Sequence, residues 1–347
     1  MLVDSPPEQR AKTAPAPPTR RAARALGLLL SVAILALAAL ASIAIGAKGL
    51  SPAQVWHGLF HDSGTYGDVV VAERLSRTVL GLLAGAALGL AGAVLQALTR
   101  NPLADPGLLG INAGASAAVV TAITYFGVTS LTGYVWFAFL GAAAVGALVW
   151  FLGGSRGATP VRLALAGTAV SAALYGYLQA VMIMDDAALG RMRFWTVGSL
   201  ASATDSTIVQ VLPFLGAGTV LALALARPLN AVAMGDDTAR ALGAHPARTR
   251  ALAMLAATVL SGAATAACGP IVFVGLMVPH VVRSFTGPDQ RWILPYAAVL
   301  APVLLLGADV AGRVVARPAE LQVGIVTALI GGPVFILLVR RRRTAQL

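Results

Sequence analysis

The sequence "GLLAGAALGLAGAVLQALTRNPLADPGLLG" (residues 81–110) joins an uncharged apolar run to an abrupt polar interruption. Glycines recur every four residues from Gly81 and so share one helix face, where small residues let helix backbones approach closely in lipid. In the interruption, Pro102 and Pro106 each fix φ and lack a backbone N–H, so the helix cannot simply continue. The stretch therefore predicts a closely packed membrane helix that ends near residue 98 and is followed by a stiff turn.

The whole chain has the composition of a membrane protein. It has 347 residues, of which 58% are hydrophobic and 11% charged, whereas soluble domains have about 25% charged residues. A helix needs about 20 apolar residues to cross the hydrocarbon core. We therefore predict an all-α polytopic membrane protein with about ten transmembrane helices, at residues 25–46, 75–98, 108–127, 132–153, 162–184, 206–227, 249–268, 270–285, 292–314 and 321–340.

The distribution of basic residues predicts the orientation of the chain. Ten spans place both termini on one side, and most of the 25 Lys and Arg residues fall on that side. Because cytoplasmic loops collect Lys and Arg, we expect both termini in the cytoplasm. Residues 1–23 are polar and Pro-rich, which predicts a disordered cytoplasmic tail before a transmembrane domain at 24–343. The net charge of +11 is explained by topology, so we expect lipid contact and no nucleic-acid partner.

The sequence lacks the motifs that several chemical functions require. The chain contains no G-x-x-x-x-G-K-[ST] phosphate-binding sequence and no H-E-x-x-H zinc motif, so we predict no enzyme activity and no cofactor. Ion-coupled carriers place carboxylates near the middle of the membrane, but the centres of these spans are almost free of charge. Asp309 lies near the outer end of its span, four residues before Arg313, where an ion pair would neutralise both.

Two smaller features have competing interpretations. His57, His61 and Asp62 could hold a metal ion, but three weak ligands in an outer loop do not make a convincing site, and we predict none. The segment at 229–250 is mildly amphipathic and is predicted to form one or two short helices outside the lipid, broken at Gly243 and Pro246. It is either an ordinary interfacial loop or a docking surface.

Three long strings resemble one family of transport proteins. The strings "RLSRTVLGLLAGAALGLAGAVLQALTRNPLADPGLLGINAGA", "GPIVFVGLMVPHVVR" and "AELQVGIVTALIGGPVF" resemble the FecCD family, the permease subunits of ABC importers for iron–siderophores, haem and vitamin B12. The resemblance runs from about residue 73 to 340. It implies the type II ABC importer permease fold in the cytoplasmic membrane. The implied partners are a second permease subunit, two cytoplasmic ATPase subunits and an extracytoplasmic substrate-binding protein.

The resemblance also implies roles for individual residues. In the 229–250 segment it implies contacts that couple the permease to the ATPase, at Gly235, Asp236, Asp237, Ala239, Leu242 and Gly243. It implies docking of the binding protein on exposed outer arginines, namely Arg74, Arg77 and Arg313. A gate or pathway is implied at Gly85, Gly89, Asn101, Pro102, Leu103 and Pro160, where Pro160 departs from the small hydroxyl residues of some relatives.

The resemblance leaves the cargo open. A ferric siderophore is the first expectation, with haem and vitamin B12 as alternatives within the same kind of importer. An ion-coupled secondary transporter, which would need no ATPase, is a further alternative from another class.

Overall fold

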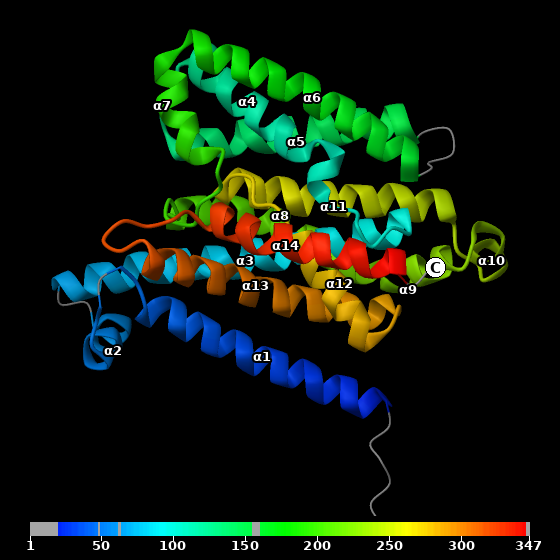
Figure 1. Ribbon diagram of the computed structural model, residues 1–347, viewed down its shortest axis with the longest axis horizontal. Coiled ribbons are helices and arrows are strands. Elements are labelled where there is room, and N and C mark those ends of the chain that lie inside the picture. The colour runs from blue at the N-terminus through cyan, green and yellow to red at the C-terminus, as the bar shows by residue number, and fades with distance from the viewer. Residues whose placement is uncertain (1–19, 48, 62–63, 155–159, 345–347) are drawn as a thin grey trace, which may run out of the picture.

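The structure, a computed structural model, describes residues 20–47, 49–61, 64–154 and 160–344 and consists of helices and their connections (Figure 1). The helices are α1 (Arg20–Ala44), α2 (Pro52–Phe60), α3 (Tyr66–Thr99), the 3₁₀ helix η1 (Pro106–Leu109), α4 (Ile111–Phe126), α5 (Leu131–Gly154), α6 (Pro160–Met184), α7 (Asp186–Trp195), α8 (Asp205–Ala224), α9 (Ala226–Ala233), α10 (Asp236–Ala241), α11 (Pro246–Cys268), α12 (Val274–Thr286), α13 (Gln290–Val315) and α14 (Val323–Thr344).

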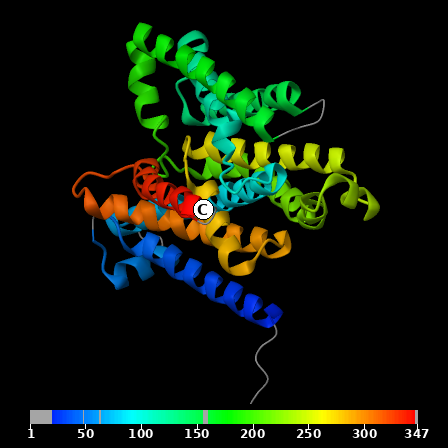
Figure 2. The same ribbon diagram turned by 45° about the vertical axis from the view of Figure 1, so that its right-hand side comes forward.

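The long helices run between two ends of the molecule. Figure 1 shows α2 and α7 at one end, here named the α2 end, and α10 with the end of α14 at the other, here named the α10 end. Helix α3 is central and packs against α11, α12 and α13. Helices α4, α5 and α6 pack together as a group beside this core, as Figure 2 also shows. The core is therefore organised around one long buried helix.

Ten helices occupy the positions of the ten predicted spans, but they are not equally long. Seven of the described helices are long and apolar enough to cross a membrane, while α4 and α14 are shorter apolar helices. The predicted span at 270–285 is only partly helical, because α12 begins at Val274 and has 13 residues. At about 1.5 Å per residue, α12 covers about 20 Å of a core that is about 30 Å thick, and the residues 270–273 before it are not helical. Helix α1 begins at Arg20, so residues 20–23 are helical.

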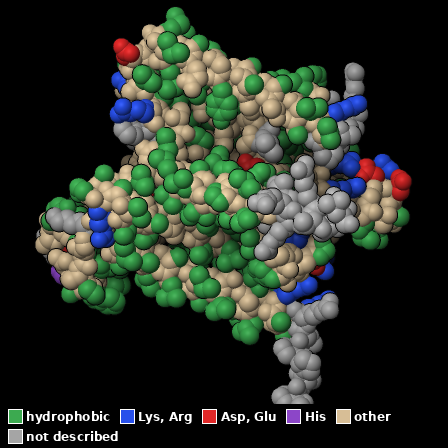
Figure 3. Space-filling view, in the orientation of Figure 1, with side chains coloured by type: hydrophobic (Ala, Val, Ile, Leu, Met, Phe, Trp, Pro, Cys, Tyr) green, Lys and Arg blue, Asp and Glu red, His purple; other side chains and the backbone are tan. Residues whose placement is uncertain are grey.

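The surface of the bundle has the pattern expected in lipid. Hydrophobic side chains cover most of the face in Figure 3, and charged side chains gather mainly near the two ends. Leu29 and Leu37 on α1 are more than half exposed, as are Leu165 and Ile183 on α6. In water such a large apolar surface would be unfavourable, whereas a hydrocarbon environment accommodates it.

Glycines set how closely the central helices approach one another. A Cβ atom on Gly92 of α3 would overlap the backbone of Gly275 on α12, and a Cβ on Gly114 of α4 would overlap Gly141 of α5. Hydrophobic exclusion from water does not drive helices together inside lipid, so close van der Waals packing of this kind is a main source of association. These contacts fix α12 against α3 and α5 against α4.

A buried ion cluster joins α3 to α13 at the α2 end. Arg77 donates from Nε and Nη2 to the Asp309 carboxylate, with its shortest contact at 2.7 Å, and from Nη1 to Glu320 at 2.7 Å. Arg313 lies 3.0 Å from the same carboxylate, which confirms the predicted pairing of Asp309 with Arg313. Asp309 is completely buried and the Arg313 side chain is 2% exposed. A charge buried to this degree is stable only when it is paired.

The same end of the bundle satisfies the last carbonyl groups of α1. Arg74 donates to the carbonyl oxygens of Ile43 and Ala44, each at 3.1 Å, and Arg313 donates to that of Ser42 at 2.9 Å. The final carbonyl groups of a helix have no partner within it, and cations are favourable there. Arginines from α3 and α13 therefore hold the end of α1 against the core.

The cluster makes a prediction about stability. Asp309→Asn removes the carboxylate between Arg77 and Arg313, and breaking a buried pair in this way costs about 3–5 kcal/mol. We expect a lower thermal unfolding temperature in detergent and a lower yield of monodisperse protein. Asp237→Asn is the matched control, because it breaks the ion pair with Arg240 in which the Asp237 side chain is fully exposed. Equal unfolding temperatures for the two variants would contradict this account.

Candidate functional site

The connection from α3 to α4 is a sequence of tight, capped turns at the α10 end. The Asn101 side chain accepts a hydrogen bond from the Leu103 N–H at 3.0 Å. The Asp105 side chain accepts one from the Gly107 N–H at 2.8 Å and thereby begins η1. Asp105 is therefore an N-cap, and the element that it starts is a single 3₁₀ turn. Such local bonds hold the connection in one conformation.

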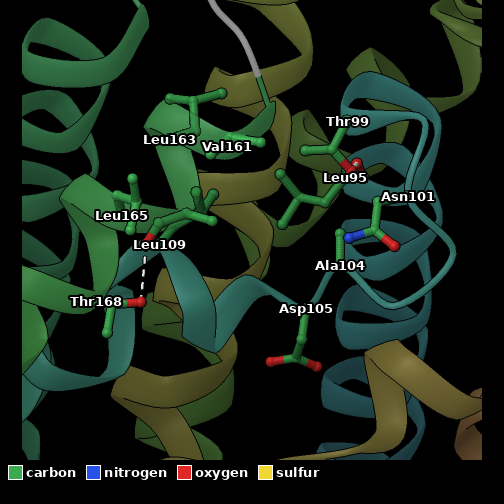
Figure 4. A pocket seen from close by; sticks show the side chains of 11 residues that line it. Leu95, Thr99, Asn101, Ala104, Asp105, Leu109, Val161, Leu163, Leu165 and Thr168 are labelled. Carbon is green, nitrogen blue, oxygen red and sulfur yellow. Dashed lines mark hydrogen bonds between the residues drawn. The ribbon is translucent and has the colours of Figure 1, made fainter. Parts of the chain in front are cut away.

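A cavity of about 280 Å³ lies between this connection and the start of α6. In Figure 4, Asn101 and Ala104 stand on one side of it and Val161, Leu163 and Leu165 on the other. The Asp105 carboxylate points away from the α6 side chains in this view. The cavity is thus mostly apolar, with Asn101, Asp105, Thr99 and Thr168 as the polar side chains that line it.

A second cavity of about 330 Å³ lies on the other side of Asp105. Segments from five parts of the fold contribute to its lining, which consists of Leu103, Asp105, Gly107, Asn112, Tyr175, Val272, Phe273, Leu276 and Phe335. Asp105 lines both cavities, and burial raises its pKa to about 6 against the opposing effect of its hydrogen bond from Gly107. The α3–α4 connection therefore separates two cavities and places a carboxyl group between them.

The segment at 229–250 forms the protruding part of the α10 end. It comprises the end of α9, the short helix α10 and the start of α11, and it turns at Gly243, where φ is +78°. Of the one or two short helices predicted here, α10 lies wholly within the segment, and the predicted break is confirmed because α10 ends before Gly243 and α11 begins at Pro246. Leu242 is 63% exposed and Met234 is 66% exposed, whereas Ala239 is buried. The segment thus presents apolar side chains on a surface that is otherwise charged.

Asp236 is the centre of the ion pairs in this segment. Arg250 of α11 donates to both of its oxygens, at 2.6 and 3.0 Å, and Arg100 approaches it at 3.4 Å. The hydrogen bonds from Arg250 lower the pKa of Asp236, with further lowering by the charges of Arg250, Arg100 and Arg240. Asp237, its neighbour, pairs with Arg240 at 2.8 Å on the exposed side of α10. The first turn of α10 is therefore tied to two other helices.

The structure brings only some of the predicted site residues together. Asn101 and Leu103 line the two cavities, and Pro102 is buried beside them. Gly85 and Gly89 instead lie where α3 meets α13, because a Cβ on either would overlap the α13 backbone. Packing accounts for both glycines, and neither lines a described cavity. Pro160 begins α6, directly before the cavity-lining Val161.

The outer arginines are less accessible than the sequence suggests. Arg74 is 7% exposed and Arg313 is 1% exposed. The expectation of a fully exposed cationic rim is wrong for these two, because both side chains turn inward to the carbonyl groups of α1. Arg77 keeps 11% of its side chain exposed, and its contact with Glu320 lies toward the surface.

The histidine pair in α2 makes a local contact. Nδ1 of His57 lies 3.1 Å from the Asp68 carboxylate, and the ring of His61 stacks on that of His57. Asp62 falls outside the described residues. Within the part of the chain that the structure describes, no group of three His, Cys, Asp or Glu side chains is placed to hold a metal ion.

Reasoning from the sequence missed Arg100 and Arg250. Each is one of many cytoplasm-side arginines in the sequence, and nothing in their spacing relates them to Asp236. The one available signal for Arg100 is its position directly before Asn101-Pro102, where a helix must end.

Comparisons with known proteins agree with this architecture. The model of the FecCD transport family matches residues 34–341. The chain is 48% identical over 327 residues to the ferric enterobactin transport system permease protein FepD of Escherichia coli (strain K12), covering 93% of this chain and 96% of FepD. It is 37% identical over 314 residues to the ferric enterobactin transport system permease protein FepG of the same organism, covering 89% and 94% respectively.

The fold is shared with a solved structure described as an inward-facing conformation of a metal-chelate type ABC transporter. The TM-score is 0.81 at 28% sequence identity, covering 91% of this chain and 99% of that chain. The fold class is therefore that of a type II ABC importer permease, as predicted. With a family model that matches nearly the whole length and relatives this similar, the chain belongs to the FecCD transport family.

Proposed function

We propose that this protein is the membrane permease of an ATP-driven importer that carries a ferric siderophore into the cell. The observation that carries this proposal is the 48% identity to FepD, whose name states ferric enterobactin transport, over nearly the full length of both chains. The α3–α4 connection between two mostly apolar cavities supports it, because a passage for a bulky chelate needs a closable constriction rather than a catalytic group. The cavities lie near the α10 end, which we place in the cytoplasm with both termini.

The cargo proposal follows from the chemistry of the lining. A siderophore supplies all the ligands of its iron, so the permease needs no metal-binding side chains of its own. The two cavities are lined mainly by apolar side chains and carry one carboxyl group, Asp105. Haem and vitamin B12 also enclose their metal, and they remain the alternative cargoes.

We propose that a second permease subunit covers the face that joins α6 to α14. Tyr175 of α6 and Phe335 of α14 line the second cavity, and both helices expose large apolar side chains, such as Leu165 and Leu329. A path between two subunits would run along this face. FepD and FepG are two different permease proteins named for one cargo, and the chain resembles both. This supports a related chain as the partner.

The proposal predicts how uptake is energised. In a strain that lacks this permease, its expression should restore uptake of a labelled ferric siderophore. Uptake should continue when an ionophore removes the proton gradient and stop when ATP is depleted, because the driving force comes from ATPase subunits. A panel of ferric catecholate, hydroxamate and citrate complexes, haem and vitamin B12 would identify the cargo.

The control is a strain that keeps the permease but lacks its ATPase, where no uptake is expected. Uptake that persists without ATP and vanishes with the proton gradient would establish the ion-coupled alternative instead.

We further propose that the 229–250 segment docks on the ATPase subunits. Its exposed Leu242 and Met234 offer apolar contact area, and Gly235, Asp237 and Gly243 lie on the same protruding turn. Anchoring apolar side chains commonly dominate the energy of such interfaces.

Leu242→Asp should therefore weaken binding of the ATPase subunits by about tenfold or more, since it places a charge in an apolar contact. Co-purification and titration of detergent-solubilised permease with the ATPase would measure this. The yield of folded permease should not change, because Leu242 is exposed on the free subunit. Undiminished ATPase binding by a well-folded variant would exclude Leu242 from the interface.

For the binding protein we propose docking at the α2 end, around Arg74, Arg77 and Arg313. Arg74 and Arg313 contribute positive potential from within the structure, whereas Arg77 reaches the surface, where Glu320 pairs with it. An acidic side chain of the binding protein would compete with Glu320 for Arg77. Charges at the rim of an interface act mainly on the rate of association.

Glu320→Gln should increase the association rate of the binding protein at low salt, and Arg77→Gln should decrease it. Both effects should shrink as salt rises, because ions screen exposed charges. Surface plasmon resonance on permease in nanodiscs, with unfolding temperatures recorded for each variant, would separate docking from loss of structure. Identical association rates for the two variants at low salt would rule out the contact.

A further inference from the structure

The end of α3 is linked directly to the 229–250 segment. Nη2 of Arg100 donates to the Val232 carbonyl oxygen at the end of α9 and lies 3.4 Å from the carboxylate of Asp236 in the first turn of α10. The α3–α4 connection thus begins at Arg100, and the side chain of the same residue contacts both α9 and α10 in the protruding segment. One side chain therefore joins the α3–α4 connection to the 229–250 segment, the two parts on which the proposed function depends.

The backbone at Arg100 is specialised for this position. Its φ of 50° and ψ of 28° lie in the left-handed region, which non-glycine residues rarely adopt and which costs about 1 kcal/mol or more. Phe273 is the other non-glycine residue with positive φ among the described residues, and it lines the second cavity. Strain of this kind persists where surrounding contacts enforce it. Arg100 is the C-cap of α3, and its side-chain contacts with Val232 and Asp236 accompany this backbone conformation.

The opposite side of the link is held by α11. Arg250 donates twice to Asp236 and is only 20% exposed at its side chain. Asp236 therefore connects α3, α10 and α11 through two arginines. Of the two arginines, Arg250 holds the Asp236 carboxylate more closely than Arg100 does, because its contacts with Asp236 are shorter and include both oxygens.

We propose that Arg100 transmits movement of the ATPase-docked α10 to the α3–α4 connection, through its bonds to Val232 and Asp236, and so sets whether the two cavities are joined. This inference rests on the proposed function and adds a positioning residue to it. Closure of the ATPases would move α10, and the Arg100 contact would draw the adjoining turns at Asn101 and Leu103 with it. Packed elements switch between discrete arrangements, so a small displacement is sufficient.

The test is the number of cargo molecules imported per ATP hydrolysed by the complete importer in proteoliposomes. Arg100→Met keeps an unbranched, flexible side chain but lacks the guanidinium group and so removes these bonds. It should lower this ratio by about tenfold, within the usual range of coupling between sites. ATP hydrolysis and assembly with the ATPase should remain. Arg100→Lys keeps a charged donor and should restore much of the ratio.

Arg291→Met is the matched control. Arg291 forms an ion pair with Asp289 at the same end of the bundle, at 2.8 Å, and it has no described bond to the α3–α4 connection. In this variant the number of cargo molecules imported per ATP hydrolysed should equal that of the wild type. A double-mutant cycle adds specificity, because the effects of Arg100→Met and Asp236→Asn on the ratio should be less than additive if the two residues act through one contact.

Hydrogen exchange supplies a readout that a purely structural role would not change. In the wild-type complex, trapping with ATP should alter exchange at residues 101–110 and at 235–250. In Arg100→Met the change at 235–250 should persist and that at 101–110 should disappear.

An unchanged ratio in Arg100→Met, or a change at 101–110 that persists in that variant, would overturn the link. If Arg100→Met fails to assemble, the same criteria apply to Asp236→Asn. A wild-type complex with no ATP-dependent uptake would instead refute the proposed function, which keeps the two failures distinguishable.

Discussion

The packing of α3 against α12 and α13 is the constraint on which the rest of the structure depends. Gly85, Gly89 and Gly92 leave no room for a Cβ on the faces that meet these helices. In lipid, burying apolar surface between helices brings no hydrophobic free energy. Close van der Waals packing at this contact must therefore supply the attraction between the helices. Because α3 is buried along most of its length, its position determines where both of its ends stand.

The two ends of α3 carry the charged residues that organise the two ends of the molecule. Toward the α2 end, Arg77 meets Asp309 and Arg74 meets the carbonyl groups of α1, in a cluster with little access to water. At the α10 end, Arg100 meets Asp236 in a partly exposed setting. Burial makes the first cluster costly to rearrange, whereas water near the second lowers the cost of exchanging partners. Helix α3 is therefore held firmly at one end and by a more easily exchanged contact at the other. This suits the role that we propose for it in positioning a gate.

This division also suits control of the nearly uncharged passage that we propose. The cavities around Asp105 offer few groups on which a ligand or an ion could act directly. Control must then come from outside the lining, by movement of the turns that separate the cavities. Asn101 and Asp105 make these turns stiff through their local hydrogen bonds. A displacement of Arg100 would therefore move the turns as a unit instead of deforming them.

The sequence alone determined the class of fold, the positions of ten helices, the break after residue 98 and the break within the 229–250 segment. These features depend on hydropathy, proline and glycine, whose effects act within a few residues. The pairing of Asp309 with Arg313 was also predictable, because four residues separate them on one helix. Tertiary structure alone decided that Arg74 turns inward to the end of α1 and that Arg100 meets Asp236. These contacts join residues 31 and 136 positions apart, and their geometry depends on how whole helices pack, which no local pattern encodes.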